Sequence, residues 1–142
     1  MDAPVRGARG DENAAAVAAV AFTVGLEPDC IAKEQAAAEA PGRRARMEEI
    51  GSFVLIDDSY SANPLSMNRM LDNASALARE KRLPLVLALG EMAELGEEAD
   101  RHQMELGEHV ARLDPALLFW KGGRFEAFAE GLSVAGFPGV VN

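Results

Sequence analysis

The 142-residue sequence has a single cysteine and few positively charged residues, and each shortage excludes a class of protein. Cys30 alone cannot form an internal disulfide framework or a multi-cysteine metal site, so we interpret it as a small apolar structural residue. Fourteen lysines and arginines against 23 acidic residues give a net charge of −9. This charge repels the phosphates of nucleic acids and of anionic lipids, so we expect neither as a partner.

Long apolar runs are also missing. No stretch of about 18 apolar residues is present to span a bilayer, and the first residues lack the basic and apolar pattern of a secretion signal. A hydrophobic fraction of 49% is nevertheless sufficient for a packed core. The length corresponds to one domain, or to one domain and part of another. These features predict a globular protein of a reducing compartment, with no membrane insertion.

An alanine-rich segment occupies the sequence before Pro41-Gly42. We expect one helix from residue 14 to about residue 24 with Asn13 as its N-cap, and a second from an Asp29 N-cap to about residue 40. The first helix is apolar on nearly every face, and neighbours on several sides must cover such a helix. This predicts that residues 1–42 belong to a larger body, or that the helix forms a dimer contact.

Strands and helices alternate in the rest of the sequence. We expect strands at residues 46–50, 53–56, 85–89 and 117–120, the first two as a hairpin, helices at about 67–78, 97–113 and 125–132, and the start of a strand at 139–142. This order predicts an α/β fold: an open, Rossmann-like, mostly parallel sheet with flanking helices. The core candidates are large apolar side chains at Met67, Met70, Trp120, Phe125 and Phe128.

The loops at the carboxyl ends of the strands are the candidate sites, because ligands of parallel α/β sheets bind there. The strongest are residues 57–64 and 90–96, and residues 121–124 form a fainter third. Asp57-Asp58 could accept hydrogen bonds from ribose hydroxyls or bind Mg²⁺, or could belong to an ordinary polar turn. A phospho-accepting receiver domain is disfavoured, because no aspartate follows either later strand.

Three further groups of polar residues have two interpretations each. Glu91 and Glu94 begin a helix, where carboxylates favour the helix dipole or could position an amine. The basic cluster Arg43, Arg44 and Arg46 could reach a nucleotide phosphate, or could be a solvated turn. The two histidines, His102 and His109, are interpreted as packed or partly exposed residues. Neither a Gly-x-x-x-x-Gly-Lys-Ser/Thr loop nor a Gly-x-Gly-x-x-Gly motif is present, so these residues cannot hold the β- and γ-phosphates of ATP unaided.

Two motifs taken together resemble the Mur ligase family. They are Leu55-Ile56-Asp57-Asp58-Ser59-Tyr60-Ser61-Ala62-Asn63-Pro64-Leu65-Ser66-Met67 and Leu89-Gly90-Glu91-Met92-Ala93-Glu94-Leu95-Gly96, the second followed by His102 and Gly107. The resemblance runs from about residue 7 to about residue 123. Ala40-Pro41-Gly42-Arg43 is similar to the family's Pro-Gly-Arg junction between its central and C-terminal domains. Residues 1–42 would then be the helical tail of a central ATP-binding domain, and residues 43–142 an incomplete C-terminal domain.

The resemblance implies a bacterial cytoplasmic, monomeric parent enzyme of peptidoglycan synthesis that uses ATP and Mg²⁺. Within the family it implies the branch that joins D-alanyl-D-alanine to UDP-N-acetylmuramoyl-tripeptide through an acyl phosphate. Carried over residue by residue, it implies nucleotide contacts at Asp58, Arg43 and Asn13. The residues expected to face the incoming amine are Tyr60, Ser61 and Asn63.

Two departures limit what the resemblance implies for this chain. Arg9-Gly10 stands where the family has the His-Asn of its adenine element, and the phosphate loop, the metal ligands and the modified lysine of the central domain are absent. We therefore expect no catalytic or metal-binding residue here, and no ligase activity from the chain alone. The alternatives are a folylpolyglutamate or cyanophycin type of ligase from the same superfamily, and a non-catalytic nucleotide-binding module.

Overall fold

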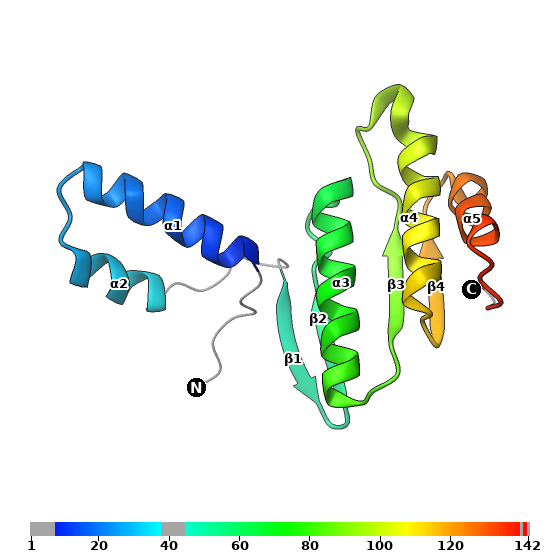
Figure 1. Cartoon of the computed structure of the whole chain (residues 1–142), viewed down its shortest axis with the longest axis horizontal. Coiled ribbons are helices and arrows are strands. Elements are labelled where there is room, and N and C mark those ends of the chain that lie inside the picture. Colours follow the sequence, from blue (N-terminus) through cyan, green and yellow to red (C-terminus); the bar gives the residue numbers. More distant parts are fainter. Residues whose placement is uncertain (1–7, 38–44, 140, 142) are drawn as a thin grey trace. The chain divides into compact units, whose positions relative to one another are not determined.

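The computed structural model describes residues 8–37, 45–139 and 141, which form two compact units, Met1–Tyr60 and Ser61–Asn142 (Figure 1). Each unit is described here by itself. Among the described residues, no helix has both the length and the apolar character needed to cross a membrane.

The first unit contains a pair of helices, α1 (Ala8–Thr23) and α2 (Pro28–Ala37). The turn between them contains Gly25 at φ +87°, a conformation that glycine adopts without strain, and the Gln35 side chain donates a hydrogen bond of 2.7 Å to the Ala14 carbonyl. The expected N-cap at Asn13 is wrong, because α1 begins at Ala8 and Asn13 lies inside it. Asp11 and Glu12 lie near the N-terminus of α1, where their negative charge favours the helix dipole and supports a start before Asn13.

The apolar character of α1 leaves large side chains in solvent. Those more than half exposed are Val17, Val20 and Phe22 of α1, together with Val24 in the turn that follows it. Only Ile31 is buried in α2, and Cys30 is exposed, so its interpretation as a packed structural residue is wrong. Two short helices cannot bury an apolar surface that runs all around one of them, as the sequence indicated.

A β-hairpin completes the first unit. Strands β1 (Arg46–Ile50) and β2 (Phe53–Asp57) pair antiparallel, with Ile50 opposite Phe53 and Gly51 at φ +62° in the two-residue turn. The predicted hairpin is confirmed.

The second unit contains the parallel part of the fold. Its elements are α3 (Pro64–Lys81), β3 (Val86–Gly90), the short 3-10 helix η1 (Gly96–Glu98), α4 (Ala99–Leu113), β4 (Leu117–Lys121) and α5 (Phe125–Val134). Strands β3 and β4 pair parallel, with Val86 opposite Leu117, and Val141 forms one parallel bridge to Leu118. The predicted α/β order is therefore confirmed. The described strands pair in two separate two-stranded sheets, one antiparallel and one parallel.

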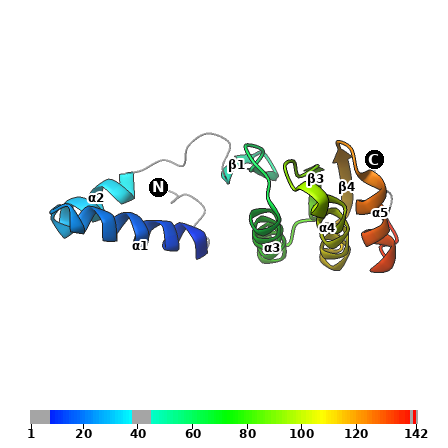
Figure 2. The same cartoon turned by 90° about the horizontal axis from the view of Figure 1, so that it is seen from above.

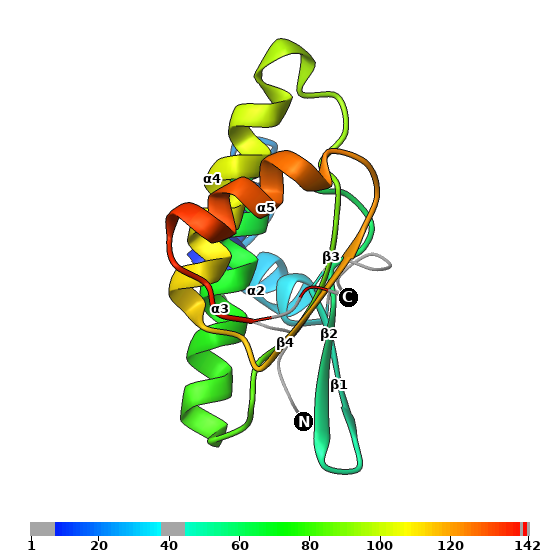
Figure 3. The same ribbon diagram turned by 90° about the vertical axis from the view of Figure 1, so that its right-hand side faces the viewer.

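The core of this unit lies between the strands and the helices. Helices α3, α4 and α5 lie on one side of β3 and β4, as Figure 2 and Figure 3 show from two directions. The buried cluster consists of Leu71, Leu87, Met92, Leu106, Val110, Leu118, Phe128 and Leu132. Of the predicted core aromatics, Phe128 is fully buried and stacks on Trp120, whereas Phe125 is 39% exposed, because it begins α5 on the solvent side.

Candidate functional site

The two adjacent aspartates after β2 perform different local tasks. Asp57 Oδ1 accepts hydrogen bonds from the Ser59 backbone N–H at 3.1 Å and from its hydroxyl at 2.6 Å, which closes a polar turn. Asp58 Oδ1 accepts from the Ala45 N–H at 2.9 Å and so ties the loop to the start of β1. One oxygen of the half-buried Asp58 carboxylate is thus engaged, and no donor among the described residues contacts Oδ2, which can accept from a ligand hydroxyl.

The other nucleotide candidates are only partly visible. The side chain of Asn13 and the whole of Arg43 lie outside the described residues. Of the basic cluster, Arg46 is described, and its guanidinium forms an ion pair with Glu48 on the same strand. The structure therefore gives Asp58 a defined geometry and leaves the predicted roles of Asn13 and Arg43 as predictions.

The residues predicted to face an amine are divided between the two units. Tyr60 ends the first unit and is 64% exposed, and Ser61 begins the second and is also exposed. Asn63 is the N-cap of α3: its Oδ1 accepts from the Ser66 N–H at 2.9 Å, and its own N–H donates to Ser66 Oγ at 3.2 Å. This capping box, with Pro64 at the first helical position, explains the local sequence. Among the described residues the amide nitrogen of Asn63 has no partner, so it can donate to a ligand.

Glu91 holds together the two loops that follow β3 and β4. Its N–H donates to the Lys121 carbonyl at 3.1 Å, and its carboxylate accepts from the Gly123 N–H at 2.7 Å. The second carboxylate oxygen lies 3.4 Å from Arg124 Nε, and the Arg124 guanidinium also pairs with Asp100 of α4. The carboxyl edge of the parallel pair is therefore a connected set of charges.

A glycine makes this close approach possible. Gly122 has φ +129°, and a Cβ atom at this position would lie 2.7 Å from the Cβ of Glu91. Any other residue would be strained in backbone and would collide with Glu91. In the sequence the 121–124 loop is only a faint candidate, yet paired glycines directly after a strand are the pattern that marks it.

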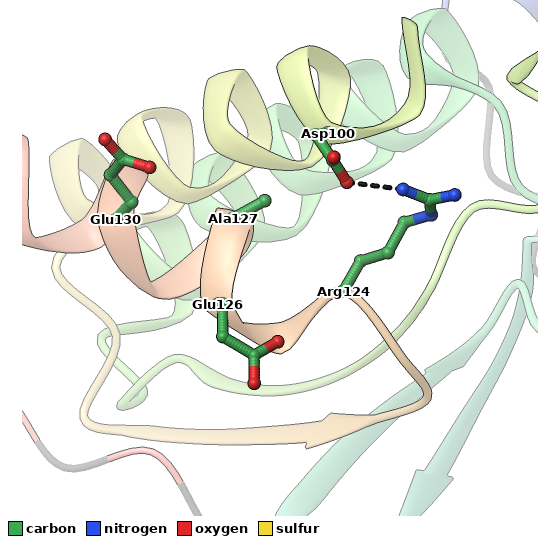
Figure 4. A pocket seen from close by; sticks show the side chains of 5 residues that line it. All are labelled: Asp100, Arg124, Glu126, Ala127 and Glu130. Carbon is green, nitrogen blue, oxygen red and sulfur yellow. Dashed lines mark hydrogen bonds and ion pairs between the residues drawn. The ribbon is translucent and has the colours of Figure 1, made fainter. Parts of the chain in front are cut away.

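A shallow, open depression lies beside this network, between the start of α5 and α4 (Figure 4). It has a volume of about 470 Å³ and is lined by Asp100, Arg124, Glu126, Ala127 and Glu130. Its carboxylates outnumber its single guanidinium. Within the described part of the chain, no three His, Cys, Asp or Glu side chains are grouped closely enough to hold a metal ion.

Helix α4 connects the surrounding segments. The fully buried Gln103 donates from Nε2 to the Met92 carbonyl at 3.4 Å, which links the helix to the loop after β3, while its Oε1 has no partner. On the exposed side, Arg101 pairs with Glu98 and Glu105. Burial raises the pKa of Glu105, but hydrogen bonds from Arg101 and His102 and the charge of Arg101 outweigh it and lower the pKa overall. These exposed pairs contribute little to stability.

We predict that Glu91→Ala loosens the two loops. The variant removes the acceptor of the Gly123 N–H and the ion pair with Arg124, and we expect a loss of about 1–2 kcal/mol in the free energy of unfolding. Urea denaturation followed by the fluorescence of the single tryptophan, Trp120, measures it. The control is Glu94→Ala, because Glu94 is exposed and belongs to the same loop. Equal urea midpoints for Glu91→Ala and Glu94→Ala would contradict the role of Glu91 in holding the two loops together.

Comparison with known proteins places these residues in a family context. The profile described as "Mur ligase, glutamate ligase domain" matches residues 42–136. A UDP-N-acetylmuramoyl-tripeptide--D-alanyl-D-alanine ligase of Escherichia coli K12 is 32% identical over 132 residues, covering 91% of this chain and 28% of the relative. The protein of the same name from Mycobacterium tuberculosis H37Rv is 36% identical over 111 residues, covering 75% of this chain and 22% of the relative.

Solved structures show the same similarity. One crystal structure of MurF from Acinetobacter baumannii superposes with a TM-score of 0.78 at 26% identity, covering 91% of this chain and 28% of that one. Another superposes with a TM-score of 0.80 at 24% identity, covering 99% of this chain and 29% of that one. MurF from Thermotoga maritima, solved with ADP, has a TM-score of 0.61 at 23% identity over 78% of this chain and 24% of its own. This chain spans less than a third of each of these relatives.

Proposed function

This chain belongs to the Mur ligase family, and from that premise we propose that it is the C-terminal part of an ATP-dependent ligase that joins D-alanyl-D-alanine to UDP-N-acetylmuramoyl-tripeptide. The observation that carries the proposal is the extended similarity to ligases of that name, over 91% of this chain in one case. The whole enzyme would act in bacterial peptidoglycan synthesis in the cytoplasm, as a monomer. The tail of the central domain would end near residue 42, where the family match begins.

The proposed reaction has two steps. The terminal carboxylate of the tripeptide attacks the γ-phosphorus of ATP, ADP leaves, and an acyl phosphate forms. The amine of D-alanyl-D-alanine, after losing a proton, attacks the acyl carbon, and the C–O bond to phosphate breaks. Both steps depend on holding the reactants in line, which is the contribution we assign to this part of the protein.

Each proposed contact uses a defined chemical group. Asp58, oriented by the Ala45 N–H, would accept a hydrogen bond from an ATP ribose hydroxyl through its other oxygen. Arg43 would reach the phosphates, and Asn13 would lie on the adenine side. Tyr60, Ser61 and the amide nitrogen of Asn63 would face the incoming dipeptide.

Magnesium does not fit the described residues. Asp57 and Asp58 both use a carboxylate oxygen for local hydrogen bonds, and no group of three suitable ligands surrounds them in the described part of the chain. We propose that Mg²⁺ and the ATP phosphates are held by other parts of a longer enzyme. It follows that this chain alone releases no ADP.

A chimera tests the proposal. This chain replaces the matching segment of the Escherichia coli ligase, and phosphate release is measured with ATP, Mg²⁺ and the UDP-linked tripeptide. We expect release that depends on D-alanyl-D-alanine and is absent with L-glutamate. Asp58→Ala should raise the KM for ATP about tenfold, because the variant loses one charge-assisted hydrogen bond to the ribose.

Three outcomes would contradict this proposal. A folded chimera that accepts glutamate and not the dipeptide would favour the folylpolyglutamate type. ADP release by the 142-residue chain alone would refute its dependence on other domains. Tight ATP binding by the chain alone, measured by calorimetry, would indicate an autonomous nucleotide-binding module.

A further inference from the structure

His109 connects α4 to α3 through both of its ring nitrogens. Nδ1 lies 3.0 Å from Asn68 Oδ1, and Nε2 lies 2.8 Å from Asp72 Oδ1. Asn68 and Asp72 are four residues apart on α3 and therefore lie on one face of that helix. The side chain of His109 is 15% exposed and that of Asp72 is 62% exposed, so water competes less for the part-buried bond to Asn68 than for the exposed bond to Asp72.

The chemistry of the three side chains keeps this link in either charge state of the imidazole. An ionised Asp72 can only accept, so Nε2 carries a proton and donates. Nδ1 then accepts from the Asn68 amide when the ring is neutral, and donates to its oxygen when the ring is charged. An amide group offers both a donor and an acceptor. Rotation of the Asn68 amide about its Cβ–Cγ bond therefore provides a partner for Nδ1 in either charge state of the imidazole.

The link matters because α3 begins at the proposed substrate loop. Asn63 caps α3, and Ser61 precedes it by two residues. Apolar contacts such as that of Leu71 attract α3 to the core, but they tolerate sliding, whereas two directional hydrogen bonds define its register on α4. A helix is stiff over this distance, so a shift at Asn68 moves the cap at Asn63 as well.

His102 on the same helix provides the contrast. Its Nδ1 lies 3.1 Å from Glu105 Oε2, and its Nε2 lies 3.3 Å from a nitrogen of Arg101, so its contacts are with its own helix. Two histidines of α4 thus differ in one respect, the link to a second helix.

We propose that His109 is a positioning residue that holds the N-terminus of α3, and with it Ser61 and Asn63, in place for the incoming amine. This inference rests on the proposed function for the role of the loop. It does not depend on that function for the link between the two helices, and the two parts are tested separately.

The first experiment uses the 142-residue chain and NMR spectroscopy. In His109→Phe, which keeps a ring of similar size without its hydrogen bonds, we expect shifted resonances and faster hydrogen exchange for the hydrogen-bonded N–H groups of Asn63, Ser66 and Met67. His102→Phe should leave these residues unchanged. Asp72→Asn retains an acceptor for Nε2, so it should restore the spectrum that Asp72→Ala loses.

The second experiment measures kinetics in the chimera. His109→Phe should raise the KM for D-alanyl-D-alanine about fivefold, while the KM for ATP stays unchanged, because only the amine-facing loop is displaced. His102→Phe should match the unmodified chimera. Asp72→Asn should again be closer to the unmodified chimera than Asp72→Ala.

The outcomes distinguish the two proposals. If the chimera without any substitution folds but is inactive, the proposed function is refuted. The NMR experiment on the 142-residue chain then still tests the link between α3 and α4. Unchanged exchange at Asn63, Ser66 and Met67 in His109→Phe would show that the link does not hold the N-terminus of α3, and would refute the positioning role. Reduced thermal stability with an unchanged KM for the dipeptide would mean that His109 is structural only, and would overturn the positioning role.

Discussion

Gly107→Ala is expected to lower the free energy of unfolding of the second unit by about 3 kcal/mol or more, because α4 and α5 pack closely at this point. A Cβ at Gly107 would collide with the Phe128 carbonyl oxygen and lie 2.9 Å from the Leu132 nitrogen. Both atoms belong to the backbone of α5 and cannot move like the end of a side chain. The gain in helix propensity from alanine, about 1 kcal/mol, is too small to offset the collision.

Thermal unfolding followed by Trp120 fluorescence measures this change. We expect the melting temperature to fall by more than about 10 °C for a unit of this size. The matched control is Gly90→Ala, whose Cβ would lie at an ordinary 3.6 Å from the Lys121 carbonyl oxygen. A Gly107→Ala chain that melts together with the Gly90→Ala chain would show that the helices do not approach this closely.

Phe128→Ala should cost about 3–4 kcal/mol, whereas Phe125→Ala on the same helix should cost less than about 1 kcal/mol. Phe128 is fully buried, and its ring stacks on Trp120 with centroids 4.2 Å apart and planes inclined by 17°. Removing it leaves a cavity in the core and an unstacked indole. Phe125 is 39% exposed and already keeps part of its ring in water.

Urea denaturation followed by far-ultraviolet circular dichroism compares the two variants. Fluorescence is unsuitable here, because losing the Phe128 ring changes the surroundings of the only tryptophan. Phe128→Ala should shift the midpoint to a clearly lower urea concentration, and Phe125→Ala should stay near the parent chain. Similar midpoints would place the two rings in similar surroundings and contradict the described core.

Local patterns predicted most of the elements because each depends on neighbouring residues. The continuous apolar run at residues 85–89 predicted a parallel strand buried on both faces; the parallel pairing is confirmed, but only one face is buried, since Leu87 is 6% and Val86 51% exposed. Gly51-Ser52 indicated a hairpin, which is confirmed. Asn13 was wrongly expected to cap a helix, because the acidic Asp11 and Glu12 favour the dipole of a helix that begins before it. Phe125 and Phe128 look alike in sequence, and only packing separates them.

The candidate site likewise contains residues that the sequence indicated and residues that only the structure connected to it. The sequence pointed to Asp58 and to the loop at Glu91 by their positions after strands, and the structure describes both loops. It marked Gly123 and Arg124 only as part of the fainter third loop and gave no role to Asp100, because the contacts among these residues and Glu91 join positions 24 to 33 apart. His109 was unremarkable for the same reason: its partner Asn68 is 41 positions away.

By itself, the sequence determined the α/β order, the apolar character of α1 and the membership of the Mur ligase family, since these follow from local periodicity and contiguous motifs. Only the tertiary structure decided which glycine lets a second helix pack closely against its own. It alone also decided which of two phenylalanines fills the core, and which of two histidines links α3 to α4. Those properties depend on the distance between segments remote in the chain, and hydrogen bonding and close packing act only over a few ångströms.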